Sequence, residues 1–385
     1  MALSYRDGIP EGMIMREVFY LFASKVSEKG LGLVVREQLR ALSEARIRVT
    51  LMSRGGFEGN NIKPLTWRHT PANALSWLPS QTYYCAQFRF FSLMAAQHLR
   101  RHAGRYDACI CWNRQGMALL PVAHTLGVKS FLNHPSWHHD YPPGASGWVD
   151  HAWPRFKRRD FDRQYELADR ILVASAQAER TFQACGVPSD KIIPIGRGAD
   201  LDEFTSPERA FRPFRVIMVG ELGERKGVIE ALEAWRYAAL PEAEFWLVGH
   251  LPHETETRVR AVAAAMPSVK IMGYRKDVGH LMAQCHVQIL PSRREGLAKS
   301  LIEGAACGLV TLATREAGLE IKEGDTGWYI KREAKQNNGE LMRRLYADEP
   351  EWRRMSKLST EDARANHTWT AFRRMFLKSI QEEVK

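Results

Sequence analysis

Short runs of apolar and β-branched residues alternate along this chain with longer stretches in which apolar residues recur every three or four positions. In the first half these runs predict strands, and an amphipathic helix at 33–45 follows the first of them. The predicted strands cover 16–23, 46–53, 106–112, 128–133, 169–175 and 191–196. Strands that alternate with helices through short connections predict a parallel sheet with helices on both faces.

A polar stretch with two prolines, residues 200–213, interrupts this alternation and is typical of a linker. The pattern then restarts, with helices expected from 226 and near 298–307. The strands of this second series are predicted at 215–220, 243–249, 269–273, 286–292 and 309–314. The sequence therefore predicts an α/β protein with two doubly wound units. Ligands of such sheets bind beyond the carboxyl ends of the strands, so the cleft between the units is the expected site.

The composition is that of an ordinary globular protein. Of 385 residues, 45% are hydrophobic and 26% charged, which excludes a disordered, collagenous or disulfide-scaffold chain. The net charge of +11 is concentrated in the first half, where 26 basic and 17 acidic residues give +9 over positions 1–200. A basic half is typical of proteins that bind nucleic acid, an anionic membrane surface or phosphorylated ligands. The charge alone does not distinguish these three partners.

Targeting and redox features favour a reducing, cytoplasmic location. The six cysteines are scattered, and the adjacent pair Cys109 and Cys111 is expected to be buried and reduced. The first residues contain frequent charges and no apolar core of a signal peptide. The sequence contains no run of 18 apolar residues, so no transmembrane helix is expected.

The stretch 291–308 contains two glutamates, Glu295 and Glu303, around a predicted strand end and helix start. Eight residues span about 12 Å along a helix. This exceeds the ~5–9.5 Å that separates the paired carboxylates of glycoside hydrolases. The two glutamates are better placed to hold two parts of a long ligand, and the amides of a helix starting near Ala298 offer a site for a diphosphate. The alternative is that Glu295 is a loop charge and Glu303 a capping or surface residue.

A second candidate is the stretch 219–235, in which Gly220 ends a strand. Arg225 and Lys226 follow at the start of the next predicted helix. Cations are unfavourable there because the N-terminal end of the helix dipole is positive. Two adjacent cations are explained if an anion binds between them, and otherwise they are solvated side chains.

Gly30 and Gly32 form a predicted turn before the first helix. The pattern is not G-x-G-x-x-G, and the second strand runs into Ser53 and Arg54 without an acidic residue. An NAD site is therefore not expected, whereas close approach of the backbone to a phosphate or sugar remains open.

The stretch 133–144 contains His134, His138 and His139 close to aromatic residues. It is interpreted as either a ligand-contacting loop or a structural one. No metal site is expected, because His138, His139 and Asp140 are contiguous and do not converge easily from one loop. The two Asp-x-Asp patterns, at 160–162 and 200–202, are interpreted as surface residues because neither ends a strand.

The stretch 148–161 combines aromatic with basic residues. Such a mixture suits an anionic lipid interface or single-stranded nucleic acid, and the alternative is a solvated helix flank. The residues concerned are Trp148, Trp153, Lys157, Arg158 and Arg159.

Together these stretches resemble the retaining nucleotide-sugar glycosyltransferases of family 4, whose GT-B fold has two Rossmann-like domains facing across a cleft. The resemblance covers residues 16–330. It rests on five ordered blocks, EKGLGLVVREQLRAL, YELADRILVASAQAERTFQACGVPSDKIIPIGRGADLDEF, VGELGERKGVIEAL, GYRKDVGHLMAQCHVQILPSRREGLAKSLIEGAACG and GDTGWYI. It implies an acceptor-binding domain at 1–204, a nucleotide-sugar domain at 205–365, and a last helix at 366–385 that crosses back to the first domain.

The resemblance also implies roles for individual residues. Glu295 would contact the hydroxyls of the donor sugar and Glu303 the ribose, while Arg225 and Lys226 would neutralise the diphosphate. His134 is the best match for a first-domain histidine near the sugar, with His138 and His139 as alternatives. The other implied donor-binding residues are Gly30, Gly32, Gly220, Tyr274, Arg275, Gly296, Leu297 and Ala298. The histidines 138 and 139 and the aromatic-basic residues of 148–159 are implied candidates for the acceptor or a membrane.

Two positions depart from the family pattern. Glu221 stands where the family often has an arginine, which leaves the diphosphate one cation short. Ala298 stands where proline or Phe-Gly variants are common, which leaves the sugar unidentified.

The expected function is transfer of a hexose from a UDP- or GDP-sugar to a glycan or lipid-linked acceptor in cell-surface polysaccharide or glycolipid synthesis. Retention of configuration is expected, and neither a metal nor a cofactor is expected. The expected location is the cytoplasm, either free or peripheral on the cytoplasmic face of the membrane. The alternatives are a nucleotide-sugar epimerase, or a non-catalytic protein that binds sugar nucleotides or nucleic acid. Nucleic acid is the partner that the site residues favour least.

Overall fold

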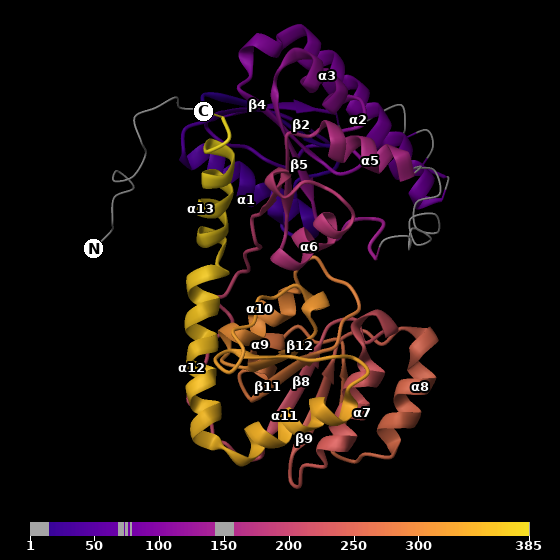
Figure 1. The fold of residues 1–385 in the computed structure, drawn as a ribbon, viewed down its shortest axis with the longest axis vertical. Helices are drawn as coiled ribbons and strands as arrows, with labels where there is room; N and C mark the ends of the chain where they lie inside the picture. Colours follow the sequence, from indigo (N-terminus) through magenta and orange to yellow (C-terminus); the bar gives the residue numbers. More distant parts are fainter. Residues whose placement is uncertain (1–14, 68–72, 74–75, 78, 143–157, 385) are drawn as a thin grey trace, which may run out of the picture. The chain divides into compact units, whose positions relative to one another are not determined.

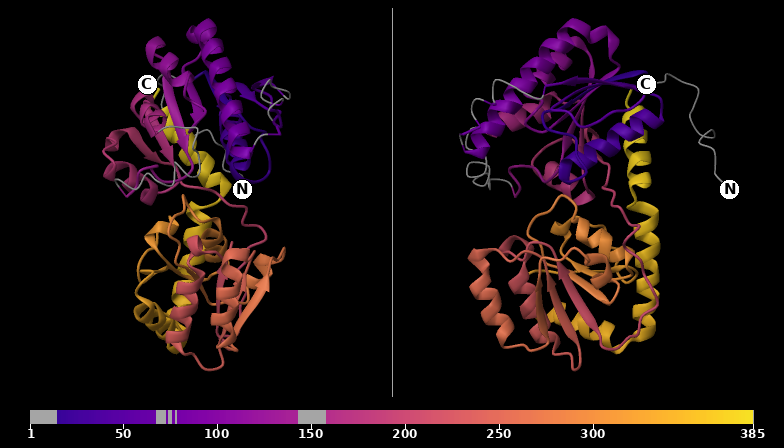
Figure 2. Two further views of the ribbon diagram at one scale, coloured as in Figure 1. Left: turned by 90° about the vertical axis from the view of Figure 1, so that its right-hand side faces the viewer. Right: turned by 180° about the vertical axis from the view of Figure 1, so that it is seen from behind.

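The computed structural model describes residues 15–67, 73, 76–77, 79–142 and 158–384. The chain divides into two compact units. Unit 1 is made of the described residues of Met1–Val173, Thr181–Ile195 and Arg373–Lys385, and unit 2 is made of Ala174–Arg180 and Gly196–Phe372. In each unit, helices flank a central sheet (Figures 1 and 2). The predicted pair of doubly wound parallel sheets is therefore confirmed.

The sheet of unit 1 has seven parallel strands in the order β3-β2-β1-β4-β5-β6-β7. The strand β1 (Glu17–Phe22) is buried at every position. This agrees with the continuous apolar run, because a parallel sheet is covered on both faces. The other strands are β2 (Arg48–Ser53), β3 (Ile62–Thr66), β4 (Ala108–Trp112), β5 (Lys129–His134), β6 (Arg170–Val173) and β7 (Ile192–Pro194).

In the described part of unit 1, four α-helices connect the strands, and a fifth begins within unit 2. These are α1 (Gly30–Glu44), α2 (Ser80–His102), α3 (Leu119–Leu126), α5 (Arg158–Leu167) and α6 (Ala176–Ala184), with short 3-10 turns η2 (Ala103–Arg105) and η3 (Ser189–Lys191). The first residues of α6 belong to unit 2 and its end belongs to unit 1.

The sheet of unit 2 has six parallel strands in the order β10-β9-β8-β11-β12-β13. They are β8 (Arg215–Val219), β9 (Glu244–Val248), β10 (Val269–Gly273), β11 (Val287–Leu290), β12 (Val310–Ala313) and β13 (Gly327–Tyr329). The helices are α7 (Val228–Ala238), α8 (His253–Ala264), α9 (Val278–Met282), α10 (Lys299–Ala306), α11 (Lys335–Ala347) and α12 (Glu349–Asn366), with 3-10 turns η4 (Glu224–Lys226) and η5 (Arg315–Ala317). Helix α7 packs against α8 and α11, and α10 packs against α9 and α12 (Figure 1).

The predicted linker, 200–213, holds no helix or strand and belongs to unit 2. Its Phe211 ring lies 5.4 Å from the Trp352 ring, centroid to centroid. Its Arg209 donates hydrogen bonds to the carbonyls of Cys285 and Cys307. The segment is therefore packed against α12 and against the loops that precede β11 and β12.

The last helix, α13 (Trp369–Gln381), begins in unit 2 and continues in unit 1 from Arg373. The Nη1 atom of Arg373 lies 2.6 Å from the Oε2 atom of buried Glu37 on α1. Further along, Glu383 pairs with Arg170 at 2.7 Å. These ion pairs fix the end of the chain on unit 1.

All six cysteines are free thiols, and Cys109 and Cys111 are buried on β4. Burial raises the pKa of the Cys109 thiol to about 12. The interpretation of these cysteines as buried, reduced thiols is therefore confirmed.

Candidate functional site

Glu295 lies between two cations in unit 2. The Nζ atom of Lys226 is 3.0 Å from its Oε1 atom, and Arg225 pairs with the same oxygen. Lys226 is only 9% exposed, whereas Arg225 is exposed. The two residues singled out in 219–235 and the first glutamate of 291–308 thus form one cluster.

The backbone that carries the two cations depends on glycine. Arg225 and Lys226 lie in η4, and α7 begins only at Val228, so the helix start predicted at 226 was wrong by two residues. Gly227, between these elements, has φ +79°, and a Cβ atom there would lie 2.2 Å from the Pro291 carbonyl. A larger residue would push η4 away from the loop that holds Glu295.

Gly220 also lies beside this cluster. It follows β8 with φ +138°, and a Cβ atom built on it would lie 3.3 Å from Cε of Lys226. The lysine side chain therefore crosses directly over the glycine that ends the strand.

The N-terminus of α10 provides free backbone donors next to Glu295. The helix begins at Lys299 without a side-chain cap and without an acidic residue in its first turn. At this helix start, the backbone amides of Gly296, Leu297, Lys299 and Ser300 have no acceptor among the described residues. Such a helix start binds anions, because its N–H groups and the helix dipole both favour negative charge.

The backbone amide of Ala298 already has a partner within unit 2. Its amide donates to the carbonyl of Ala317 at 3.0 Å, and its side chain is buried in the core of unit 2. In this structure the contact with η5 satisfies the Ala298 amide, and its implied role toward a donor stays a prediction.

Glu303 is buried on α10 with 8% of its surface exposed, so it is not the surface residue that the alternative supposed. Its Oε1 atom lies 2.5 Å from Nζ of Lys299, one turn earlier. Burial raises the pKa of the Glu303 carboxyl, and Lys299 and Arg197 oppose that shift. The Glu303 carboxylate is thus held beside Lys299, the first residue of α10.

Arg197 is a residue that the sequence analysis missed. It follows β7, belongs to unit 2, and interacts electrostatically with both Glu303 and Glu295. A single arginine in a loop gives no sequence signal, because nothing in its neighbours shows that it is buried.

Tyr274 and Arg275 follow β10. The Tyr274 ring is 74% exposed. Arg275 forms a double hydrogen bond with Asp277, at 2.8 and 2.7 Å, which holds the pKa of that carboxyl at about 2. Tyr274 is therefore open to solvent, while the guanidinium of Arg275 already has an anionic partner.

In unit 1, Gly30 and Gly32 lie within the first turn of α1 and not in a turn before it. A Cβ atom on Gly32 would lie 2.3 Å from Oγ of Ser27 and 2.8 Å from its backbone nitrogen. The absence of a side chain at Gly32 thus lets the segment after β1 pack against the helix start.

His134 ends β5 and is buried. Its Nδ1 atom lies 2.8 Å from the Ser136 carbonyl, while Nε2 lies 2.8 Å from Nδ2 of Asn113 and 3.1 Å from the Tyr165 hydroxyl. Burial lowers the pKa of His134 to about 3. The ring is therefore neutral, donates from Nδ1 and accepts at Nε2, so both nitrogens are used within unit 1.

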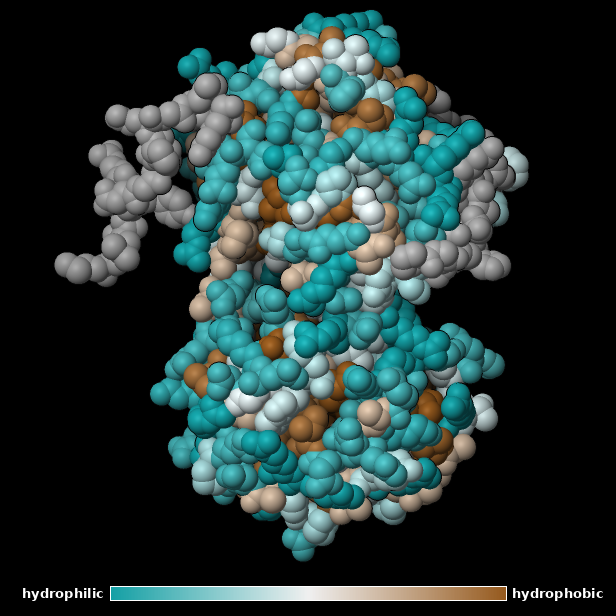
Figure 3. All heavy atoms as spheres, in the orientation of Figure 1, coloured by the Kyte–Doolittle hydropathy of each residue, from teal (hydrophilic) through white to brown (hydrophobic). Residues whose placement is uncertain are grey.

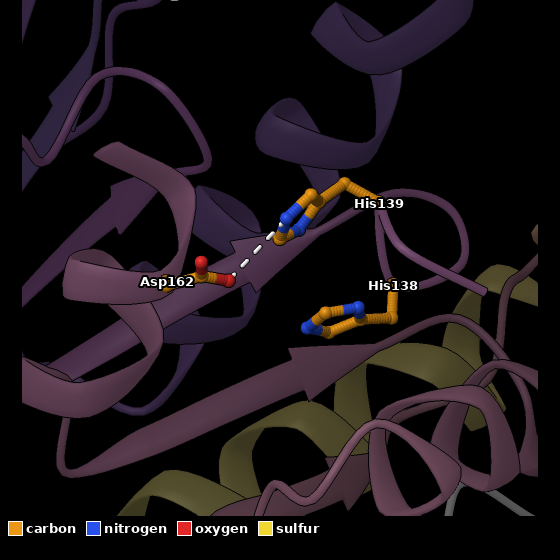
Figure 4. Close-up of side chains that lie close together, drawn as sticks. All are labelled: His138, His139 and Asp162. Carbon is orange, nitrogen blue, oxygen red and sulfur yellow. Dashed lines mark ion pairs between the residues drawn. The ribbon is translucent and has the colours of Figure 1, made fainter. Parts of the chain in front are cut away.

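His138 and His139 lie together with Asp162 of α5 (Figure 4). The Nε2 atom of His139 is 3.3 Å from a carboxylate oxygen of Asp162. Arg158 supplies a positive charge to the same group, since it pairs with Asp140 and lies 3.8 Å from Asp162. The Nδ1 atom of His138 accepts the backbone N–H of Asp140. The cluster therefore already contains the cation that its carboxylates need, and the expectation of no metal stays a prediction.

The aromatic-basic stretch is only partly described. Trp148, Trp153 and Lys157 lie outside the described residues. Arg158 and Arg159 are exposed at the start of α5. Asp160 and Asp162 lie on this helix and not at a strand end, as the sequence predicted.

Two family descriptions match successive parts of the chain. Residues 29–203 match "Glycosyltransferase Family 4", and residues 213–348 match "Glycosyl transferases group 1". The chain belongs to the group 1, family 4 glycosyltransferases. This confirms the resemblance that the five sequence blocks carried.

Known proteins agree with this assignment. The chain is 23% identical over 186 residues to the amylovoran biosynthesis glycosyltransferase AmsK of Erwinia amylovora, a match that covers 44% of this chain and 46% of AmsK. The matched region thus spans about half the length of this curated relative.

Solved structures match over nearly the whole chain. Sucrose-phosphate synthase from Thermosynechococcus elongatus aligns with a TM-score of 0.69 and 16% identity, covering 96% of this chain and 99% of that one. HepE from Anabaena, in complex with UDP-glucose, aligns with a TM-score of 0.65 and 13% identity, covering 95% and 99%. At these identities the likeness concerns the fold, and it agrees with the predicted GT-B class.

No helix in the described part of this family 4 chain is both long and apolar enough to span a bilayer. On the face drawn in Figure 3, hydrophobic residues form small separate patches among hydrophilic ones.

Proposed function

We propose that this family 4 protein transfers a hexose from a nucleoside-diphosphate sugar to an acceptor hydroxyl, with retention and without a metal. The observation that carries the proposal is the cluster in unit 2, where Lys226 and Arg225 meet Glu295 beside the free amides that begin α10. Such a cluster combines groups for a diphosphate with a carboxylate for sugar hydroxyls.

The cations of this cluster stabilise the leaving group. Cleavage of the bond between sugar and phosphate places negative charge on the leaving diphosphate. Preorganised positive charges and amides at that point lower the barrier most, and the buried Lys226 is the more preorganised of the two cations.

A same-face route fits the state of the carboxylates. Glu295 is held by two cations and Glu303 by Lys299. A carboxylate bound in this way is a weak nucleophile, so a covalent sugar–enzyme intermediate is disfavoured. In the same-face route, the leaving phosphate takes the proton of the acceptor hydroxyl as the new bond forms.

For the donor we propose a UDP-sugar. HepE, which shares the fold, was solved with UDP-glucose, and AmsK is named for amylovoran biosynthesis. We propose by analogy a glycan or lipid-linked acceptor of cell-surface polysaccharide or glycolipid synthesis.

The donor class is tested by thermal shift with UDP, GDP and ADP. A ligand at 100 times its Kd stabilises by about 2.7 kcal/mol, or roughly 2–4 °C for domains of this size. A shift with UDP alone supports the proposal. No shift with any of the three contradicts it.

The reaction type is tested by a proton NMR time course with UDP-glucose and no added acceptor, so that water takes the sugar. The α anomer of glucose should appear first, because configuration is retained. The β anomer first would contradict retention. Inversion at a ring carbon other than the anomeric one would indicate the epimerase alternative.

The partner we propose for unit 1 is an anionic membrane surface. Residues 59–106 include no aspartate or glutamate but six lysines and arginines. Along α2, three exposed arginines, Arg89, Arg100 and Arg101, accompany Leu93, which is 63% exposed. Cations next to exposed apolar side chains suit a lipid interface.

This partner is tested by co-sedimentation with vesicles of phosphatidylcholine alone or with phosphatidylglycerol. Binding should require the anionic lipid and fall when the three arginines of α2 become glutamate. The matched control reverses three exposed cations of unit 2, Arg236, Arg258 and Lys331. Equal losses of binding in both variants would contradict a membrane surface. Binding to RNA without any binding to the vesicles would also contradict it.

A further inference from the structure

We propose that Arg197 binds the diphosphate of the donor and takes the place of the cation that Glu221 removes. The inference rests on the proposed function, because it assigns a residue to the same donor site.

The position of Arg197 is fixed by backbone contacts within unit 2. The amide of Ala199 donates to the His367 carbonyl at 2.9 Å, and Ala199 pairs with Thr368 in an isolated parallel bridge. A Cβ atom on Gly198, which lies between Arg197 and Ala199 in the sequence, would be 2.5 Å from the Trp369 ring. The segment therefore lies flat against the start of α13, and Arg197 is held at one place in the unit.

The side chain of Arg197 is half-buried, and its inner guanidinium nitrogen has no direct partner. Its Nε atom is inaccessible to solvent and has no hydrogen-bond acceptor among the described residues. Among the described residues, no carboxylate forms an ion pair with the Arg197 guanidinium. Burial lowers the pKa of this group. Holding an unpaired cation partly out of water is costly, and binding an anion would lower that cost.

The segment that holds Arg197 follows β7 directly beside the segment after β6, where Ser175 donates a hydrogen bond to the Gly296 carbonyl at 2.6 Å, so this cation lies on the side of the donor cluster. Glu303 and Glu295 both act electrostatically on Arg197. Each of them is already paired, Glu303 with Lys299 and Glu295 with Lys226 and Arg225. Arg197 is therefore surplus positive charge beside two carboxylates that have their own cations.

The charge balance of the cluster leaves room for a diphosphate. Four cations face two carboxylates, so positive charge is in excess where the amides of α10 are also free. Glu221, at the position that the family resemblance assigns to an arginine, is exposed and carries a negative charge. Arg197 supplies the cation that this position lacks, and a guanidinium binds phosphate oxygens in a paired geometry.

The experiment measures affinities for UDP, inorganic pyrophosphate and uridine by calorimetry. Arg197→Ala should weaken UDP and pyrophosphate binding on the order of 10- to 100-fold, the effect of one charged hydrogen-bonding partner. Uridine, which has no phosphate, should bind unchanged. Arg258→Ala, which removes an exposed arginine of α8, is the matched control and should change none of the three affinities.

Compensation provides a second readout. Adding Glu221→Arg to Arg197→Ala should restore most of the lost UDP affinity, because it returns the cation to the family position. Arg197→Lys, which keeps the charge, should lie between the wild type and Arg197→Ala. If Arg197→Ala does not fold, Arg197→Lys and Arg197→Gln provide the comparison.

The outcomes separate this inference from the proposed function. Unchanged UDP affinity in the folded Arg197 variants, or equal losses for UDP and uridine, would overturn the role of Arg197 while leaving the donor site in place. Wild-type protein that binds neither UDP nor pyrophosphate would overturn both.

Discussion

The Nζ atom of Lys226 lies 3.0 Å from Oε1 of Glu295, although 68 residues separate them in the chain. One comes from the turn after β8 and the other from the loop after β11, and these strands are neighbours in the sheet. The pair therefore forms because two neighbouring parallel strands end at the same edge of the sheet. In the proposed function, Lys226 faces the diphosphate and Glu295 the sugar.

Replacing Lys226 with alanine should lower turnover at saturating UDP-glucose on the order of 10²-fold, by analogy with loss of one oxyanion donor. Arg225→Ala should cost less, because Arg225 is exposed and its charge is screened by solvent. The measurement is kcat for UDP release. Near-normal turnover in Lys226→Ala would exclude the lysine from leaving-group stabilisation.

The burial of Glu303 predicts a pH dependence of stability. Burial raises the pKa of this carboxyl, so between its unfolded and folded pKa values the folded state holds the proton more tightly. Stability from this group is complete below the unfolded value and is lost as pH rises through the folded one. Glu303→Gln should flatten the melting temperature across that acidic range.

Lys299→Ala, which removes the partner of Glu303, is the comparison. It should raise the carboxyl pKa further and extend the decline in melting temperature to higher pH. Identical profiles for wild type and Glu303→Gln would show that Glu303 does not titrate differently on folding.

Most of the strands could be predicted because a parallel sheet is buried on both faces, which turns each strand into a continuous apolar run. The edge strand β3 was missed, since its sequence IKPLT is largely exposed and contains Lys63 and Pro64. The three-residue β13 was also not predicted, because so short an element has no periodicity.

The candidate site was predictable where the chemistry shows in local spacing. Two adjacent cations after a strand glycine, and two glutamates around a helix start, identified the cluster. Arg197 was missed because burial of a loop arginine depends on contacts with distant residues. The pairing of the Ala298 amide with Ala317 was missed for the same reason.

His134 should stay neutral throughout the physiological range. Its pKa of about 3 follows from burial. The unfolded chain binds the proton near pH 6.5, so stability from this ring is present above that value and is lost as pH falls toward 3. In NMR spectra the ring Cε1 proton should show no titration between pH 5 and 8. A midpoint near 6.5 would contradict the hydrogen bonds to Asn113 and Tyr165.

Gly227 provides the sharpest test of how the backbone positions the cations. Gly227→Ala introduces a left-handed strain and a Cβ atom 2.2 Å from the Pro291 carbonyl. We expect a loss of about 3 kcal/mol or more in the free energy of unfolding, because backbone must move. Gly324→Ala is the matched control, since its φ is +81° with nothing within 4 Å of the added atom. Strain alone should cost about 1–2 kcal/mol there. Urea unfolding measures both, and equal losses would show that Gly227 makes no close approach to the loop that carries Glu295.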